Sequence, residues 1–113
     1  MKLMVSGSRG VTDSLYVSVV LFKMVNDIDH INVGNAKGVD QFVIGFAKYY
    51  GIPFTVFHPD WKKGRGAGLK TNLDMLNNSD ALLAFHDGKS TGTKHAIDNA
   101  RKMGMPVTVF SAT

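Results

Sequence analysis

ALLAFHDGKSTGTK, residues 81–94, is the stretch that decides the fold. Five apolar residues, 81–85, come first and a helical pattern over residues 93–103 follows, which predicts a turn from a buried strand into a helix. The turn holds small hydroxyls, glycines and lysines. Glycine lets a backbone approach a ligand closely, and the first amides of a helix point outward with partial positive charge. We therefore expect this turn to seat a phosphate or another anion.

Two other turns have the same composition. SGSRG, residues 6–10, follows the short apolar segment 2–5, and GNAKGVD, residues 34–40, follows the apolar segment 30–33. A helix with one apolar face begins at Val39 and stops at Gly51. Each turn therefore also reads as a connection from a strand into a helix.

Strands and helices alternate along the whole chain. The predicted strands are residues 2–5, 30–33, 54–57, 81–85 and 107–110, and the predicted helices are residues 14–28, 39–50, 69–78 and 93–103. The strands are continuously apolar, as in a parallel sheet that helices cover on both faces. We predict a three-layer, Rossmann-like, doubly wound α/β fold with the order βαβαβαβαβ, in a single domain over residues 1–113.

The glycine-rich turns are expected to share one edge of this sheet. Ligands of such folds bind beyond the carboxyl ends of the strands, and all these turns lie there, together with the long loop 58–68. The connections at the opposite edge are plain. Glycines in any one turn could serve the turn alone, but four such turns on one edge favour a single ligand pocket.

Composition excludes several classes of function. The chain has 113 residues, no Cys and a net charge of +4, and all nine acidic residues are Asp. No disulfide or thiolate metal site is possible, no metal-ligand spacing occurs among the histidines, and carboxylate chemistry would have to come from Asp. No run approaches a membrane span and no signal peptide is visible, so we expect a cytoplasmic protein. The charge permits nucleic acid or a phosphorylated ligand, and a solvated surface equally.

The predicted helix over residues 14–28 is apolar around most of its circumference. A helix that packs one face on a sheet needs only a stripe of apolar residues. The helix is therefore either deeply buried or a subunit interface, and the second interpretation predicts a homo-oligomer. Its apolar residues are Leu15, Tyr16, Val17, Val19, Val20, Leu21, Phe22, Met24, Val25 and Ile28.

Familiar nucleotide signatures are absent, but another family is recognisable. No G-x-G-x-x-G follows the first strand, and Leu83 stands where a P-loop has its first glycine. The chain instead resembles the SLOG superfamily, which includes the DprA/Smf and LOG proteins, and within it the stand-alone YspA/YpsA-related branch of bacteria and phages. The matching motifs run in order along the chain: Gly7-Ser8-Arg9, residues 36–40, Asp60-Trp61, residues 64–68, Asn72 and residues 87–93.

The resemblance implies a sheet in the order 3-2-1-4-5 and a site for nucleotides or nucleotide-derived ligands. Ala96 stands where the LOG phosphoribohydrolase pattern has Glu, and the chain has no Glu. LOG-type hydrolysis is therefore not expected. The residues predicted to bind the ligand or its phosphate are Gly7, Ser8, Arg9, Gly34, Lys37, Gly38, Asp40, Trp61, Arg65, Asn72, Asp87, Ser90, Gly92, Thr93 and Lys94.

Several of these residues carry two interpretations. Gly92, Thr93 and Lys94 would hold a phosphate, or form a plain helix start. Asp40 could hold a ribose hydroxyl or cap its helix, and Asp87 could be a general base, a sugar ligand or a turn residue.

Three further side chains could take part in binding. Arg9, with Ser8, offers a fork for phosphate and Arg65 a second cation, while Trp61 would stack on a base or simply pack.

Two functions remain open from the sequence. The first is binding of a nucleoside phosphate or an ADP-ribose-like ligand by a sensor or sequestering protein, with weak N-glycoside hydrolysis by Asp40 or Asp87 as an addition. The second is binding of single-stranded nucleic acid in the manner of the DprA core, supported by the positive net charge, by Trp61 and by the basic stretch Lys62-Lys63-Gly64-Arg65.

Overall fold

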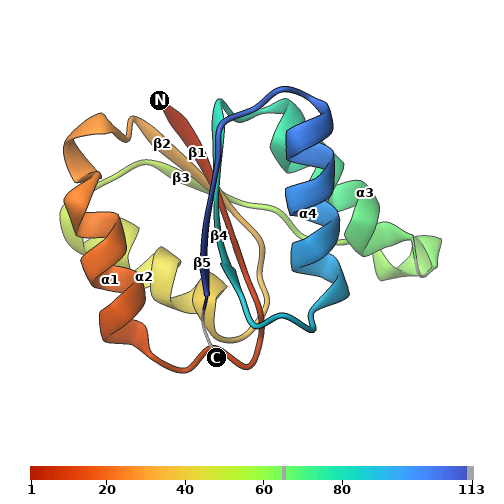
Figure 1. The fold of residues 1–113 in the computed structure, drawn as a ribbon, viewed down its shortest axis with the longest axis horizontal. Helices are drawn as coiled ribbons and strands as arrows, with labels where there is room; N and C mark the ends of the chain where they lie inside the picture. The colour runs from red at the N-terminus through yellow and green to blue at the C-terminus, as the bar shows by residue number, and fades with distance from the viewer. Residues whose placement is uncertain (65, 112–113) are drawn as a thin grey trace.

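The computed structural model describes residues 1–64 and 66–111. Within them, five parallel strands form one sheet in the order β3-β2-β1-β4-β5 (Figure 1). This confirms the predicted doubly wound α/β fold, and the strand order is the one that the resemblance implied. The strands are β1 (Lys2–Gly7), β2 (His30–Val33), β3 (Phe54–Val56), β4 (Ala81–His86) and β5 (Val107–Ser111).

Helices cover both faces of the sheet. Helices α1 (Ser14–Lys23) and α2 (Val39–Tyr50) lie on one face, and α3 (Ala67–Asn77) and α4 (Thr91–Lys102) lie on the other (Figure 1). Two short 3-10 helices, η1 (Val25–Asp27) and η2 (Trp61–Lys63), follow α1 and precede α3. None of the helices in the described residues is both long and apolar enough to span a bilayer.

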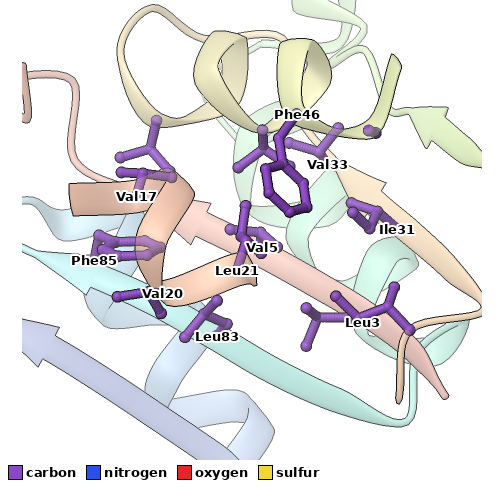
Figure 2. Packing of buried hydrophobic residues seen from close by; sticks show 14 of the residues in the cluster. Leu3, Val5, Val17, Val20, Leu21, Ile31, Val33, Phe46, Leu83 and Phe85 are labelled. Atoms are coloured by element: carbon purple, nitrogen blue, oxygen red, sulfur yellow. The ribbon is translucent and has the colours of Figure 1, made fainter. Parts of the chain in front are cut away.

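The core has two halves because alternate residues of each central strand point to opposite faces. Leu3, Val5, Leu83 and Phe85 pack against α1 and α2 in the larger cluster, which Figure 2 shows. Met4, Leu82 and Ala84 pack on the other face with α3 and α4. Burial on both faces explains why β1 and β4 read as continuously apolar in the sequence.

The helix predicted over residues 14–28 is wrong in its length. Helix α1 ends at Lys23, and η1 follows from Val25 to Asp27. Asn26 and Asp27 have side chains that compete with the helical backbone for hydrogen bonds, and the chain must turn there so that Ile28 can enter the core. The N-terminal ammonium of Met1 also bonds the carbonyl of Asp27, at 2.7 Å, which ties this turn to the start of β1.

Other boundaries move by one or two residues. Strand β1 continues through Ser6 and Gly7, so the turn after it begins at Ser8. Part of the loop predicted over residues 58–68 is helical, because η2 and the first two residues of α3, Ala67 and Gly68, lie within it. The three leucines from which α3 was predicted do not share one buried face. Leu76 is buried, whereas Leu69 and Leu73 are exposed.

Candidate functional site

A cavity of about 830 Å³ lies at the carboxyl edge of the sheet. We call it the edge pocket. Its walls come from the loops after β1, β2, β3 and β4 and from one face of α3. The predicted ligand-binding residues that line it are Gly7, Arg9, Gly34, Lys37, Asp40, Trp61, Asn72, Asp87, Ser90, Gly92 and Thr93.

Three predicted residues do not line the edge pocket. Ser8 is buried, and its Oγ accepts a hydrogen bond from the Asp87 amide at 3.1 Å, which braces the β1–α1 loop against the β4–α4 loop. Gly38 is the N-cap residue before α2 and has a φ of 78°, a conformation that favours glycine. The Lys94 ammonium pairs with Asp98 at 2.8 Å on the outer face of α4. Arg65, predicted to bind phosphate, lies outside the described residues.

One wall of the pocket was predicted from the sequence only at Asn72. It comes from α3, where Gly68, Thr71, Asn72 and Met75 follow one another at helical spacing and face the cavity. This face carries small, polar and flexible side chains, so the leucine pattern drew attention to a different face. The other lining residues, which were not among the predicted ligand-binding residues, are Val5, Ser6, Gly10, Asn35, Ala36, Phe57, Pro59, Leu69 and Thr91.

The β4–α4 turn presents backbone donors to the pocket. Asp87 Oδ1 accepts hydrogen bonds from the amides of Lys89 and Ser90, both at 2.8 Å, and these bonds hold the pKa of the Asp87 carboxyl below its usual value. Of the three roles that the sequence allowed for Asp87, the structure shows that of a turn residue, whose side chain bonds the backbone of its own turn. The amides of Thr91 and Gly92 have no hydrogen-bond partner within the described residues. They are the first two amides of α4, where an anion is stabilised by the helix dipole.

Space above this turn is open. A Cβ added to Gly92 would meet no atom within 4 Å in the described part of the chain. Asn72 holds the turn from the other side, because its Nδ2 donates to the Gly92 carbonyl at 3.1 Å. The turn that was predicted to bind a phosphate is therefore held by hydrogen bonds and has room beside it.

Two cations line the same pocket. Arg9, in the β1–α1 loop, and Lys37, in the β2–α2 loop, are both exposed. Neither forms a salt bridge with another described residue. Side chains of this kind are available to an anionic ligand without first breaking an ion pair.

Asp40 is the buried charge of the pocket. It is the second residue of α2 and is 7% exposed, and its Oδ2 accepts a hydrogen bond from the Ala36 amide at 2.9 Å. The carboxyl thus braces the loop before α2 and does not cap its own helix. Burial raises the pKa of Asp40 to about 6, against the opposing effects of the Ala36 hydrogen bond and of the positive charge of Arg9.

The position of Asp40 depends on a glycine. A Cβ added to Gly34 would lie 2.8 Å from Asp40 Oδ2, so glycine at this position makes room for the carboxyl. Oδ1, the other carboxyl oxygen, has no hydrogen-bond partner among the residues that the structure describes.

An aromatic side chain stands at the β3 end of the pocket. Trp61 is 61% exposed, and its ring lies 3.3 Å from the place that a Cβ on Gly68 would occupy. Phe57, Leu69 and Met75 also line the pocket. The lining therefore combines apolar and cationic side chains, as do sites for ligands with a planar ring and an anionic group.

A metal site is not formed by the described residues. Within 1–64 and 66–111, no three His or Asp side chains gather closely enough to hold an ion. Ala96, where the LOG pattern has Glu, is fully buried between α4 and the sheet.

Comparison with known proteins gives one relationship. No family model matches the chain. The chain is 32% identical over 84 residues to the Gene 61 protein of Mycobacterium phage D29, in an alignment that covers 68% of this chain and 67% of the phage protein.

Proposed function

The chain belongs to the family of the Gene 61 protein of Mycobacterium phage D29, and we propose that it binds a nucleotide or a nucleotide-derived small ligand in the edge pocket. In this proposal the protein is a sensor or a sequestering protein. The name of the phage relative specifies no ligand, so the proposal rests on the geometry of the pocket and on the resemblance to SLOG proteins.

The observation that carries the proposal is the place of the pocket in the sheet. Strand β1 lies between β2 and β4, so the order of the strands reverses beside β1, and the pocket is lined by the loops that follow both β1 and β4. Open α/β sheets bind ligands at this switch point. The volume of the edge pocket, about 830 Å³, lies within the range of about 300–1,000 Å³ that is usual for small-molecule sites.

The charges favour an anionic ligand with an apolar part. The unpaired amides of Thr91 and Gly92 would receive a phosphate, with Arg9 and Lys37 as counter-charges. A base would lie toward Trp61. Binding is favoured over hydrolysis because Asp87 is held in its turn, which leaves Asp40 as the carboxylate for any weak N-glycoside cleavage.

The experiment is a thermal-shift and calorimetric screen of nucleoside phosphates and ADP-ribose against two matched variants. Arg9→Ala removes a pocket cation, and Arg101→Ala removes the same charge from the far end of α4, where Arg101 is exposed. Wild type and Arg101→Ala should bind alike, and Arg9→Ala should bind about 10-fold or more weakly, the usual effect of losing a charged hydrogen bond. Gly92→Leu, which fills the open space, should have the same effect.

Two results would overturn this proposal. One is equal binding by Arg9→Ala, Gly92→Leu and wild type, and the other is binding of no phosphorylated ligand at all. Native mass spectrometry of the purified protein, followed by denaturing extraction, would identify any ligand class that the protein retains.

Single-stranded nucleic acid is the second candidate ligand. The exposed residues Trp61, Lys62 and Lys63 form one 3-10 helix at the rim of the pocket, where a base could stack beside two cations. The two functions differ in their dependence on salt. Affinity for a single strand should fall by roughly 0.7 log units per log unit of salt for each neutralised phosphate, whereas a pocket ligand should depend on salt much less.

We also propose that the protein self-associates through α1. Leu15, Val19 and Phe22 form an exposed stripe on this helix, at helical spacing. A second copy is the partner that would cover this stripe, because a twofold axis near Val19 with the α1 helices antiparallel sets the stripe of one copy against the stripe of the other.

A further inference from the structure

We propose that Asp40 makes the edge pocket specific for ribosyl phosphates, by accepting a hydrogen bond from a free 2′- or 3′-hydroxyl of the ligand. The inference rests on the proposed function, and it goes beyond it by naming the part of the ligand that is recognised and the atom that recognises it.

The first argument is an acceptor without a donor. Asp40 is more than nine-tenths buried and lines the pocket. The Ala36 amide donates a hydrogen bond to one of its two carboxyl oxygens, Oδ2. Oδ1 has no donor within residues 1–64 and 66–111, and it is not among the fully buried unpaired atoms, so it remains accessible from the cavity. A carboxylate oxygen in such a place is costly until a donor reaches it.

The second argument concerns the kind of donor. Arg9 and Lys37 line the same pocket, and their positive charges disfavour a cationic group of the ligand near Asp40. The negative charge of Asp40 in turn disfavours a phosphate beside it, which leaves the phosphate to the first turn of α4. A neutral hydroxyl next to a phosphate-bearing part of the ligand satisfies both conditions.

The third argument concerns the geometry of the loop. Gly34 leaves room for the carboxyl, and the Ala36 hydrogen bond fixes its rotation so that Oδ2 faces the loop. An acceptor held in this way loses little freedom when a ligand arrives, which is the condition for selectivity. A site built around a buried polar atom rejects analogues that lack the matching hydroxyl more strongly than an apolar site can.

Protonation provides an independent readout. Burial raises the pKa of Asp40 to about 6, and among the described residues the charged groups that share the pocket with it are Arg9, Lys37 and Asp87. An ionised Asp40 carboxylate accepts a strong hydrogen bond from the hydroxyl. A protonated Asp40 carboxyl has no charge, so it accepts this hydrogen bond less strongly. The preference for a hydroxyl should therefore weaken as the pH falls through about 6, while binding of a ligand without the hydroxyls should change less.

The experiment is calorimetric titration with each ribonucleoside 5′-monophosphate and its 2′,3′-dideoxy counterpart. Wild type should bind the ribonucleotide about 10-fold or more tightly, and most of this preference should disappear in Asp40→Asn together with its dependence on pH. Asp74→Asn, an isosteric change at an exposed carboxylate of α3, is the matched control and should behave as wild type. Circular dichroism and thermal melting establish that each variant is folded.

The outcomes separate this inference from the proposed function. Equal affinity for the ribo- and dideoxy compounds, or a preference that Asp40→Asn retains, overturns the role of Asp40 and leaves nucleotide binding standing. Failure of every nucleotide to bind overturns the proposed function, and this inference with it. Loss of affinity for both compounds to the same extent in Asp40→Asn would show that Asp40 supports the loop and does not read the hydroxyl.

Discussion

Two groups of physical effects act in opposite directions on the ionisation of the Asp40 carboxyl. Its position in the first turn of α2, its bond to the Ala36 amide and the nearby Arg9 all favour the charged form. Burial opposes them and prevails, since the pKa rises from 3.8 to about 6. A buried residue that costs the fold stability when it is ionised is a candidate for function.

The raised pKa predicts how Asp40→Asn changes stability with pH. The native state holds the Asp40 proton more tightly than the unfolded chain, so the stability due to this group is fully present below pH 3.8 and is lost as the pH rises through about 6. Asn has the same shape and can still accept from the Ala36 amide. Asp40→Asn should therefore be more stable than wild type above the folded pKa, by up to about 3 kcal/mol from the shift in pKa.

The measurement is urea denaturation of both proteins as a function of pH. The stabilities should converge on the acid side and diverge as the pH rises. If Asp40→Asn is equally stable or less stable than wild type across this range, the carboxylate is better solvated in the native state than its burial indicates.

At the scale of elements, the contact between β1 and α2 depends on glycine. Gly7 is the last residue of β1 and Val39 is the first of α2. A Cβ at position 7 would lie 2.3 Å from Val39 Cγ2 and 2.5 Å from its Cβ, too close for either element to keep its place. Gly7 was predicted from its ligand-binding motif, and the structure adds a packing role to its place in the pocket wall.

Gly7→Ala should therefore destabilise the protein, and Gly45→Ala should not. Overpacking at a site without room costs about 1–3 kcal/mol, and the Val39 contact places Gly7 toward the upper part of that range. Gly45 lies in the interior of α2, where an added Cβ meets no described atom within 4 Å, so alanine there should gain about 0.5–1 kcal/mol.

Thermal melting of the two variants beside wild type gives the comparison. An unchanged melting temperature in Gly7→Ala would mean that β1 and α2 can separate without cost. Such a result would also remove the rigidity that we assign to the β1–α1 and β2–α2 sides of the pocket.

At the scale of the molecule, α1 is not the deeply buried helix that was one of the two possibilities its sequence allowed. Val17, Val20 and Leu21 are buried against the sheet, as Figure 2 shows, whereas Leu15 and Phe22 are 72% and 55% exposed. Part of the apolar surface of the helix is therefore open to solvent, and the subunit interface stays a prediction. The aromatic ring of Tyr50 on α2 extends this surface beside Phe22, with ring centroids 5.8 Å apart.

Self-association through this surface should respond to a charge at its centre. Phe22→Asp should shift a dimeric wild type toward the monomer at micromolar concentration, because it buries a carboxylate in an apolar contact. Leu73→Asp places the same charge on an exposed apolar position of α3, in the opposite layer, and should leave the mass unchanged. Sedimentation velocity measures both, and a wild type that is strictly monomeric would contradict the proposed pairing.

Much of the fold could be predicted because its signals are local. Apolar segments separated by Gly, Pro and capping residues indicated every strand, and β2 has the predicted limits, His30–Val33. Asp13 caps α1 as its type predicts, with its side chain accepting from the Tyr16 amide. The end of α1 was missed because Met24 and Val25 continue an apolar pattern, while the turn that ends the helix is required by the distant start of β1.

The sequence by itself determined the class of fold and the edge at which its polar turns meet, since alternating strand and helix signals and the chirality of parallel connections leave few other arrangements. Tertiary structure decided which side chains share the pocket. It placed Thr71 and Met75 in the wall and buried Asp40 behind Gly34. The set of side chains that share the pocket depends on how α2, α3 and α4 pack on the sheet, which no local pattern of residues encodes.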